Sequence, residues 1–298
     1  MDASKFPTLD PELAPVLAFL PDMSEGMNDV EGARAMLKTV IPQGPVAGEE
    51  LLDITEVEHE GTRLRVYRPR TGATRGVLYL HGGGFCIGDL DSEHGGAVQI
   101  ANAVDAIVVS VDYRLAPEHP YPAGLDDCMN GLRYLASIAG PIAVHGQSAG
   151  GGLGAATVLR ARDEGGPAIA FQSLGIPELD DRLETPSMQA FTDTPLWARP
   201  QAVKSWEYYL GGQVADGYAA PARHQDLSGL PPAHVTVMEL DPLRDEGITY
   251  ALRMLQAGVS VELHAYPGTF HGSSLVTDAA VSKRQTEDLI GALRRGLS

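Results

Sequence analysis

Hydrophobic residues recur along the chain in two alternating patterns. Short apolar runs predict six strands at Gly76–Leu80, Ala106–Val111, Ile142–His145, Ala168–Gln172, Val235–Leu240 and Val259–Tyr266. Stretches with helical spacing lie near 92–104, 122–138, 149–164, 245–257 and 280–296. Strands that alternate with helices of this length are typical of βαβ units. The pattern therefore predicts an α/β fold with a mostly parallel sheet covered by helices on both faces.

Residues 1–48 depart from this alternation. Apolar positions at helical spacing follow Asp10, which we expect to cap a helix with Pro11 at its first position. A second amphipathic helix is expected to end at Pro42. Strand-like segments then flank Glu60-Gly61, which predicts a β-hairpin.

Residues 177–232 are the second departure. They contain several prolines, no clear strand and an aromatic-rich helical stretch around Trp197–Tyr209. We interpret this segment as an insertion that, with residues 1–48, forms a helical cap over one edge of the sheet. Aromatic residues at helical spacing more often pack a helix than line a pocket, so we expect this cluster to pack the cap. Residues 1–298 are thus expected to form a single domain.

Composition narrows the classes of protein. The chain has 298 residues, of which 44% are hydrophobic and 20% charged, values that exclude a disordered or fibrous protein. The net charge of −17 disfavours binding to nucleic acid or to anionic lipid. Cys86 and Cys128 cannot form a disulfide framework, and no spacing suggests zinc. With neither a signal peptide nor a membrane span in the sequence, we expect a cytoplasmic protein.

The segment Gly146-Gln147-Ser148-Ala149-Gly150 matches the pattern G-x-S-x-G. This pattern marks a nucleophile elbow, a tight strand-to-helix turn that exposes a serine hydroxyl. A predicted strand precedes the motif and a helical stretch follows it, as an elbow requires. The motif alone leaves open a glycine-rich turn with an idle serine.

A second motif, His81-Gly82-Gly83-Gly84-Phe85, closes the first predicted strand of the parallel sheet. Consecutive glycines leave backbone N–H groups free to face a site. Such donors can hold the negative oxygen of a tetrahedral intermediate. A flexible connecting loop is the alternative, but a histidine followed by three glycines is rare at this composition, which favours the oxyanion interpretation.

A nucleophilic serine also needs a base, and the base needs an orienting acid. In folds with a nucleophile elbow, the chain order is serine, then acid, then histidine. Asp241 ends one predicted strand after Ser148, and His271 follows the next. Because ligands of open α/β sheets bind at the carboxyl ends of the strands, we expect these three residues to meet at one rim.

Other acids and histidines compete for these roles. We expect Asp245 to cap the following helix, and Glu246 lies in the same stretch. His264 falls inside a predicted strand, where it is expected to be packed or at the surface. His145 precedes the elbow and is expected to be a buried strand residue, while His81 is expected to hydrogen-bond its own loop.

The chain resembles the bacterial hormone-sensitive-lipase-like (family IV) esterases, a branch of the α/β-hydrolase superfamily. The resemblance runs from about Gly76 to His271 and rests on His81–Phe85, Asp112–Ala123, Gly146–Gly151, Asp241–Gly247 and Phe270–Gly272. It implies a catalytic triad of Ser148, Asp241 and His271. It also implies an oxyanion hole made by the backbone N–H groups of Gly83, Gly84 and Ala149.

The same resemblance sets expectations about function. We expect a serine hydrolase that cleaves small carboxylic esters, with short- to medium-chain acyl groups, through an acyl-enzyme. Relatives need no cofactor or metal, and they often form dimers through sheet-edge strands. Residue 147 is usually Asp, or Thr in a sister group, and is Gln147 here, which affects the subgroup and the substrate preference. An amidase or lactonase with the same triad is an alternative, as is a non-catalytic small-molecule-binding relative.

Two further motifs carry little weight. Gly150-x-Gly152-x-x-Ala155 fits the loose dinucleotide fingerprint, but the next predicted strand does not end in the acidic residue that this site needs. The run Asp89–Glu93 resembles a calcium loop, yet Ile100 stands where the closing glutamate should be. We expect this run to cap the following helix.

Overall fold

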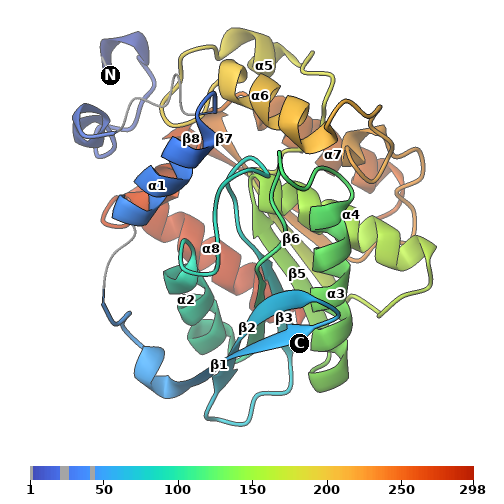
Figure 1. The fold of residues 1–298 in the computed structure, drawn as a ribbon. Helices are drawn as coiled ribbons and strands as arrows, with labels where there is room; N and C mark the ends of the chain where they lie inside the picture. The colour runs from blue at the N-terminus through green and yellow to red at the C-terminus, as the bar shows by residue number, and fades with distance from the viewer. Residues whose placement is uncertain (1–2, 21–26, 41–43) are drawn as a thin grey trace.

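A single sheet of eight strands organises the computed structural model, which describes residues 3–20, 27–40 and 44–298 (Figure 1). The strand order is β1-β2-β4-β3-β5-β6-β7-β8. The strands are β1 Leu52–His59, β2 Thr62–Pro69, β3 Gly76–Leu80, β4 Ile107–Val111, β5 Ile142–Gln147, β6 Phe171–Gly175, β7 Ala233–Leu240 and β8 Val261–Phe270. The pairs β1–β2 and β2–β4 are antiparallel, and all the other pairs are parallel.

Helices cover both faces of this sheet. Helices α2 (His94–Val104) and α8 (Ala280–Gly296) pack with one face, in a core that includes Tyr67, Val77 and Phe171. Helices α3 (Ala123–Ile138), α4 (Ala149–Asp163) and α7 (Arg244–Gln256) pack with the other face, in the largest core cluster. The predicted α/β fold, with a mostly parallel sheet between two helical layers, is therefore confirmed.

Most element boundaries agree with the prediction, but strands β6 and β8 are shifted. The run Ala168–Gln172 was expected to be a strand, but β6 occupies Phe171–Gly175. The polar residues Gln172 and Ser173 are fully buried in this strand, where Gln172 donates from Nε2 to the carbonyl of Pro231 at 3.0 Å. Buried polar side chains hide the apolar pattern on which the boundary was based. Strand β8 also continues to Phe270, beyond its predicted end at Tyr266.

The N-terminal segment differs in the kind of helix it forms. Asp10 accepts a hydrogen bond from the Glu12 N–H at 2.8 Å, but the helix that follows, η2 (Ala14–Ala18), is a 3₁₀ helix. The predicted cap at Asp10 is therefore displaced from the helix start. Helix α1 (Val30–Val40) forms as expected, while Pro42, its predicted end, lies outside the described residues. The hairpin between β1 and β2 turns at Glu60-Gly61, as predicted.

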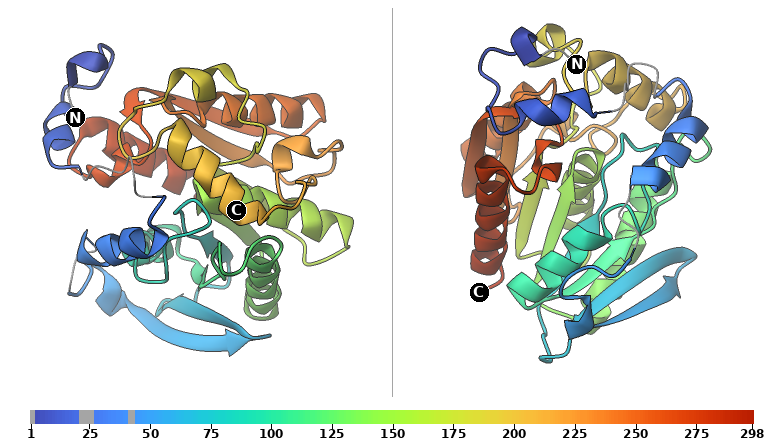
Figure 2. Two further views of the ribbon diagram at one scale, coloured as in Figure 1. Left: turned by 45° about the horizontal axis from the view of Figure 1, so that its top comes forward. Right: turned by 90° about the vertical axis from the view of Figure 1, so that its left-hand side faces the viewer.

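The insertion contains helices α5 (Pro186–Ala190) and α6 (Arg199–Leu210) and no strand among its residues, all of which are described. In Figure 1 these yellow helices lie above the sheet, with the blue α1 beside them. A view with this end brought forward shows them across the strand ends (Figure 2, left). Leu13 and Leu17 lie in one buried cluster with Phe270 at the end of β8, and Met27 lies in another with Trp197 of the insertion. The N-terminal segment therefore packs against both the end of the sheet and the insertion.

Two smaller expectations concern the cysteines and membranes. Cys86 and Cys128 are both buried free thiols. Over the described part of the chain, no helix combines the length and apolar character that crossing a bilayer requires.

Candidate active site

Ser148 sits at the turn between β5 and α4 with φ 56° and ψ −124°, backbone angles that a non-glycine residue rarely adopts. Neighbouring glycines make this turn sterically possible. A Cβ atom at Gly146 would lie 2.1 Å from the carbonyl oxygen of Gly150. One at Gly150 would lie 2.1 Å from the carbonyl oxygen of Leu80. The glycines of the motif are therefore required because the backbone approaches them too closely for a side chain.

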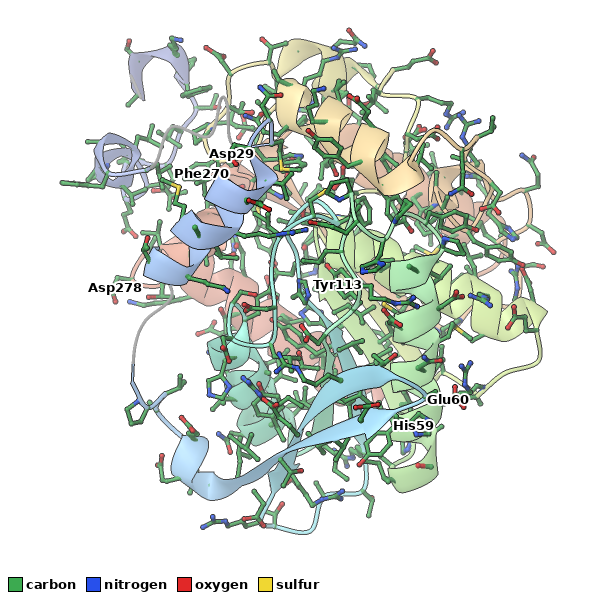
Figure 3. The ribbon with its side chains drawn as sticks, in the orientation of Figure 1. Asp29, His59, Glu60, Tyr113, Phe270 and Asp278 are labelled. Carbon is green, nitrogen blue, oxygen red and sulfur yellow. The ribbon has the colours of Figure 1, made fainter. Side chains whose placement is uncertain are left out.

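The ends of three parallel strands bring Ser148, His271 and Asp241 together. Ser148 Oγ lies 2.9 Å from His271 Nε2, and His271 Nδ1 lies 2.8 Å from Asp241 Oδ2. With the proton on Nδ1, the imidazole donates to the carboxylate and its Nε2 can accept the serine proton. The second oxygen of Asp241 accepts the Leu243 N–H at 2.9 Å, which fixes the carboxylate. Phe270, labelled in Figure 3, is the last residue of β8, and His271 follows it directly in the sequence.

All three side chains are shielded from solvent. Ser148 and His271 are each 7% exposed and Asp241 is 1% exposed. The ring of Trp197, which precedes α6, lies 5.8 Å from the His271 ring, measured between centroids. Low solvent access strengthens electrostatic interactions within such a site. The arrangement is chemically suited to proton transfer from the hydroxyl to the imidazole.

The glycine-rich loop after β3 lies beside Ser148. A Cβ atom built on Gly82 would lie 3.6 Å from the Cβ of Ser148. Gly83 and Gly84 have φ of +120° and +55°, which favour glycine. The N–H groups of Gly83, Gly84 and Ala149 donate to no acceptor among the described residues. Three backbone donors next to the serine are thus available to a ligand.

Two side chains that hydrogen-bond to this loop were not predicted to do so from the sequence. Glu93 was expected to help cap the next helix, but it makes no side-chain cap bond to α2. Its carboxylate instead accepts the Gly82 N–H and the Tyr79 hydroxyl, each at 2.7 Å. Tyr113 donates its hydroxyl to the His81 carbonyl at 2.8 Å, and its ring stacks on His81 at 4.1 Å. The side chains that hold the loop thus lie 11 and 32 positions along the chain from the loop residues they bind.

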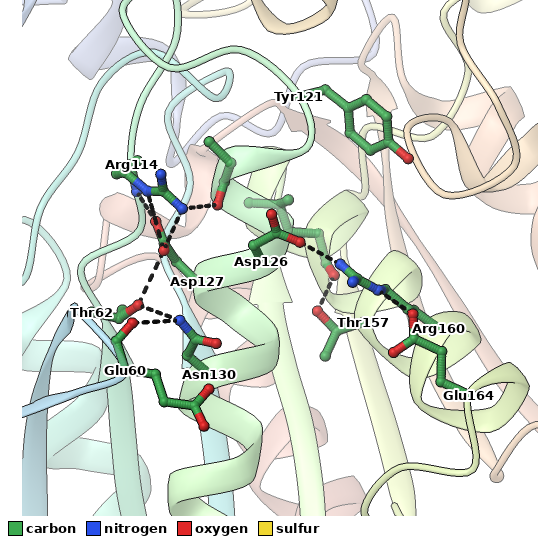
Figure 4. Close-up of polar contacts among 12 residues, drawn as sticks. Glu60, Thr62, Arg114, Tyr121, Asp126, Asp127, Asn130, Thr157, Arg160 and Glu164 are labelled. Carbon is green, nitrogen blue, oxygen red and sulfur yellow. Dashed lines mark hydrogen bonds and ion pairs between the residues drawn. The ribbon is translucent and has the colours of Figure 1, made fainter.

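A polar network anchors the segment that carries Tyr113, which lies in the interior of the molecule (Figure 3). Asp127 of α3 is 3% exposed and accepts the Arg114 N–H at 2.8 Å and the Thr62 hydroxyl at 3.0 Å (Figure 4). Arg114 also contacts the same carboxylate through Nε at 2.9 Å. A buried carboxylate with this many donors is well satisfied. The segment around Tyr113 therefore has a structural role.

The competing residues occupy other sites. Asp245 lies in the first turn of α7 rather than at its cap, and its Oδ2 accepts the Ser187 N–H at 2.7 Å. Glu246 accepts the Leu179 N–H at 2.6 Å. His264 contacts Glu262 Oε1 at 2.8 Å. His145 is buried in β5, as predicted.

The aromatic cluster divides into two parts. Trp206 and Tyr209 pack against Phe85, with ring centroids 5.4 and 4.0 Å apart, so they stabilise the insertion as expected. Trp197 differs, because it contacts both the His271 ring and the glycine-rich loop: a Cβ at Gly84 would lie 2.6 Å from its ring. Gln147, the departure from the family pattern, lines a small cavity of about 50 Å³ with His145 and His234.

Known proteins resemble this chain in sequence and in fold. Residues 77–275 match the family model described as alpha/beta hydrolase fold. Esterase LipI and Carboxylesterase NlhH, both from Mycobacterium tuberculosis, are 38% and 39% identical to this chain. The LipI alignment covers 99% of this chain and 95% of the relative, and the NlhH alignment covers 98% and 97%.

Solved structures give the same result. One described as Bacterial Heroin Esterase is 48% identical, with a TM-score of 0.94 and 99% of each chain covered. A thermostable esterase from Pseudomonas putida ECU1011 is 28% identical, with a TM-score of 0.91 and 98% of each chain covered. The chain thus belongs to the α/β-hydrolase family, in its hormone-sensitive-lipase-like branch.

Proposed function

We propose that this protein is a carboxylesterase that cleaves small carboxylic esters through an acyl-enzyme. The observation that carries the proposal is the continuous hydrogen-bond chain from Ser148 through His271 to Asp241, at 2.9 and 2.8 Å. Relatives that align with nearly the whole chain are named esterase and carboxylesterase, which supports an ester as the substrate.

Acylation begins when Ser148 Oγ attacks the ester carbonyl carbon while His271 Nε2 takes the hydroxyl proton. The carbonyl π bond opens to give a tetrahedral oxyanion. When the oxyanion collapses, the bond to the leaving alcohol breaks, and His271 donates its proton to that oxygen. Water then attacks the acyl-enzyme with His271 again as base, which releases the carboxylic acid and restores Ser148. Asp241 orients the imidazole and stabilises its cationic form.

The backbone N–H groups of Gly83, Gly84 and Ala149 are proposed to hold the oxyanion. Each such donor contributes about 3–4 kcal/mol to transition-state stabilisation in serine hydrolases. Their lack of other acceptors among the described residues supports this role.

Residues 1–48 and 177–232 are proposed to form the cap over the substrate. The packing of Met27 with Trp197 in one cluster supports a cap made from both segments. The closeness of the Trp197 ring to the His271 ring, at 5.8 Å, favours short acyl and alcohol groups. A series of p-nitrophenyl esters of increasing acyl length is expected to show the highest kcat/KM for short chains.

The decisive test is Ser148→Ala. We expect turnover of p-nitrophenyl acetate to fall to the background rate while the melting temperature and circular dichroism spectrum stay unchanged. Turnover at the wild-type level in this variant would refute the proposal.

A homodimer formed through the free edge of β8 is a further part of the proposal. β8 is a terminal strand of the sheet, and Leu263 on it is exposed, as are Leu252 and Leu255 on the adjacent α7. Edge strands with exposed apolar residues are suited to pairing with a second copy. Leu263→Lys is expected to convert a dimer into a monomer in light scattering, and a wild-type monomer would refute this.

A further inference from the structure

The glycine-rich loop holds three successive residues at positive φ: Gly83 at 120°, Gly84 at 55° and Phe85 at 59°. Such a conformation persists only where the surroundings over-determine it. The Cys86 N–H donates to the Gly83 carbonyl at 3.1 Å, and the Ala116 N–H donates to the Phe85 carbonyl at 3.0 Å. These bonds come from the loop itself and from the segment around Tyr113.

The Gly84 carbonyl is held differently, by the insertion. Ser205 of α6 is fully buried and donates its hydroxyl to this carbonyl at 3.0 Å. A Cβ at Gly84 would also lie 3.2 Å from Ser205 Oγ, so the helix and the loop are in close contact. Since the Gly84 N–H is a proposed oxyanion donor, a bond that fixes this residue also fixes the donor.

A buried acid stands next to the same hydroxyl. Glu178 is fully buried, and neither of its carboxyl oxygens has a hydrogen-bond partner among the described residues. Its own N–H donates to the Ser148 carbonyl at 3.1 Å, which places it directly behind the elbow. Burial raises the pKa of Glu178, and the nearby Ser205 hydroxyl opposes this effect by lowering it.

The Ser205 hydroxyl has a single proton to donate. With Glu178 protonated, that proton is free to go to the Gly84 carbonyl, as the structure has it. An ionised Glu178 would be a much stronger acceptor and would compete for the same proton. The Gly84 carbonyl would then lose its tie to the insertion.

We propose that Ser205 and Glu178 are positioning residues for the glycine-rich loop. Ser205 joins helix α6 to Gly84, and the protonation state of Glu178 controls that hydrogen bond. The inference rests on the proposed function and adds residues beyond the proposed triad and the proposed oxyanion donors.

Several titratable groups surround Glu178. Burial raises the pKa of Glu178 to about 8 and that of Cys86 to about 12, and it also raises that of Tyr209, so neither the thiol nor the phenol ionises near pH 8. The negative charge of Asp241, after β7, also raises the pKa of Glu178. Glu246 of α7 is a second buried acid whose pKa is raised by burial. The variant Glu246→Gln therefore shows whether Glu246, rather than Glu178, causes a change in kcat at alkaline pH.

The test compares kcat and KM for p-nitrophenyl acetate from pH 6 to 10. We expect kcat of the wild type to decline above about pH 8, and Glu178→Gln to abolish that decline, because the amide fills the same space and does not ionise. Ser205→Ala is expected to lower kcat roughly tenfold at pH 7 with little change in KM, since one positioning hydrogen bond is lost. Glu246→Gln should keep the alkaline decline.

Thr157→Val is the matched control for Ser205→Ala. It removes a buried hydroxyl that donates to the Leu153 carbonyl at 2.7 Å within α4. The control should lower the melting temperature to a similar degree while leaving kcat near the wild-type value. An alkaline decline retained in Glu178→Gln, or a kcat in Ser205→Ala within twofold of the wild type, would overturn the inference. Failure of the proposed function would be seen in a different experiment, as turnover retained by Ser148→Ala.

Discussion

At the scale of single residues, hydrogen bonds fix the geometry of the proposed triad. Asp241 is 1% exposed, and its two oxygens are taken by His271 and by the Leu243 N–H. A buried carboxylate with both oxygens satisfied can orient an imidazole without moving. Ser148 is held from the other side, where its own N–H donates to the Gly175 carbonyl at 2.8 Å.

This geometry predicts the effect of Asp241→Asn. The amide can donate to His271 Nδ1, which stabilises the tautomer with the proton on Nε2 and removes the base. We expect kcat to fall roughly 10⁴-fold, as in other triads that lose the carboxylate, with KM little changed.

Asp288→Asn is the control for that variant. Asp288 Oδ2 lies 3.1 Å from His264 Nδ1, so the control alters a similar carboxylate–histidine contact away from the triad. We expect its steady-state parameters to match the wild type. A kcat for Asp241→Asn within tenfold of the wild type would contradict the orienting role of Asp241.

At the scale of elements, the glycine-rich loop, which is proposed to hold the oxyanion, is fixed by steric contacts as much as by hydrogen bonds. Gly83 has φ +120°, and a Cβ there would lie 2.1 Å from the Ile87 carbonyl oxygen. Gly83→Ala is therefore expected to displace the loop and lower kcat by about 10²-fold or more, the effect of losing one oxyanion donor.

Gly61→Ala is the control, because it introduces backbone strain without a steric clash. Gly61 has φ +77° in the β1–β2 turn, and a Cβ there would meet nothing within 4 Å. The control should lose stability, measured by thermal unfolding, and keep its kcat. Equal activity of Gly83→Ala and the wild type would show that the loop does not supply the donor.

The elements also show what the sequence allowed us to predict. Local patterns predicted the alternation of strands and helices, the elbow at Ser148 and the histidine after β8, because each depends on neighbouring residues. The contacts of Glu93 and Ser205 with the glycine-rich loop were missed. Ser205 and Gly84 are 121 positions apart, and nothing in the sequence around either residue indicates the other.

At the scale of the whole molecule, two buried histidines make the stability of the fold depend on pH in the acidic range. Burial lowers the pKa of both His145 and His234 to about 4, from a usual value of 6.5. The unfolded chain therefore binds more protons than the native protein between about pH 6.5 and pH 4, and the free energy of unfolding falls as the pH falls through this range.

We expect each histidine to lower the free energy of unfolding by on the order of 3 kcal/mol once the pH has fallen below about 4. Urea unfolding at pH 7.0, 6.0 and 5.0 measures it. The variant His145→Asn keeps a polar side chain that does not titrate, so its stability should depend less steeply on pH than that of the wild type. Parallel pH dependences of the two proteins would show that His145 is not a neutral buried group.

The most direct test of the account is covalent labelling of the nucleophile by a fluorophosphonate, followed by intact mass and peptide mapping. We predict one adduct per chain, located on Ser148, with labelling abolished in Ser148→Ala and strongly slowed in His271→Ala. An unlabelled wild-type protein, or an adduct on another residue of a protein that still hydrolyses p-nitrophenyl acetate, would contradict the assignment of Ser148 as the activated nucleophile.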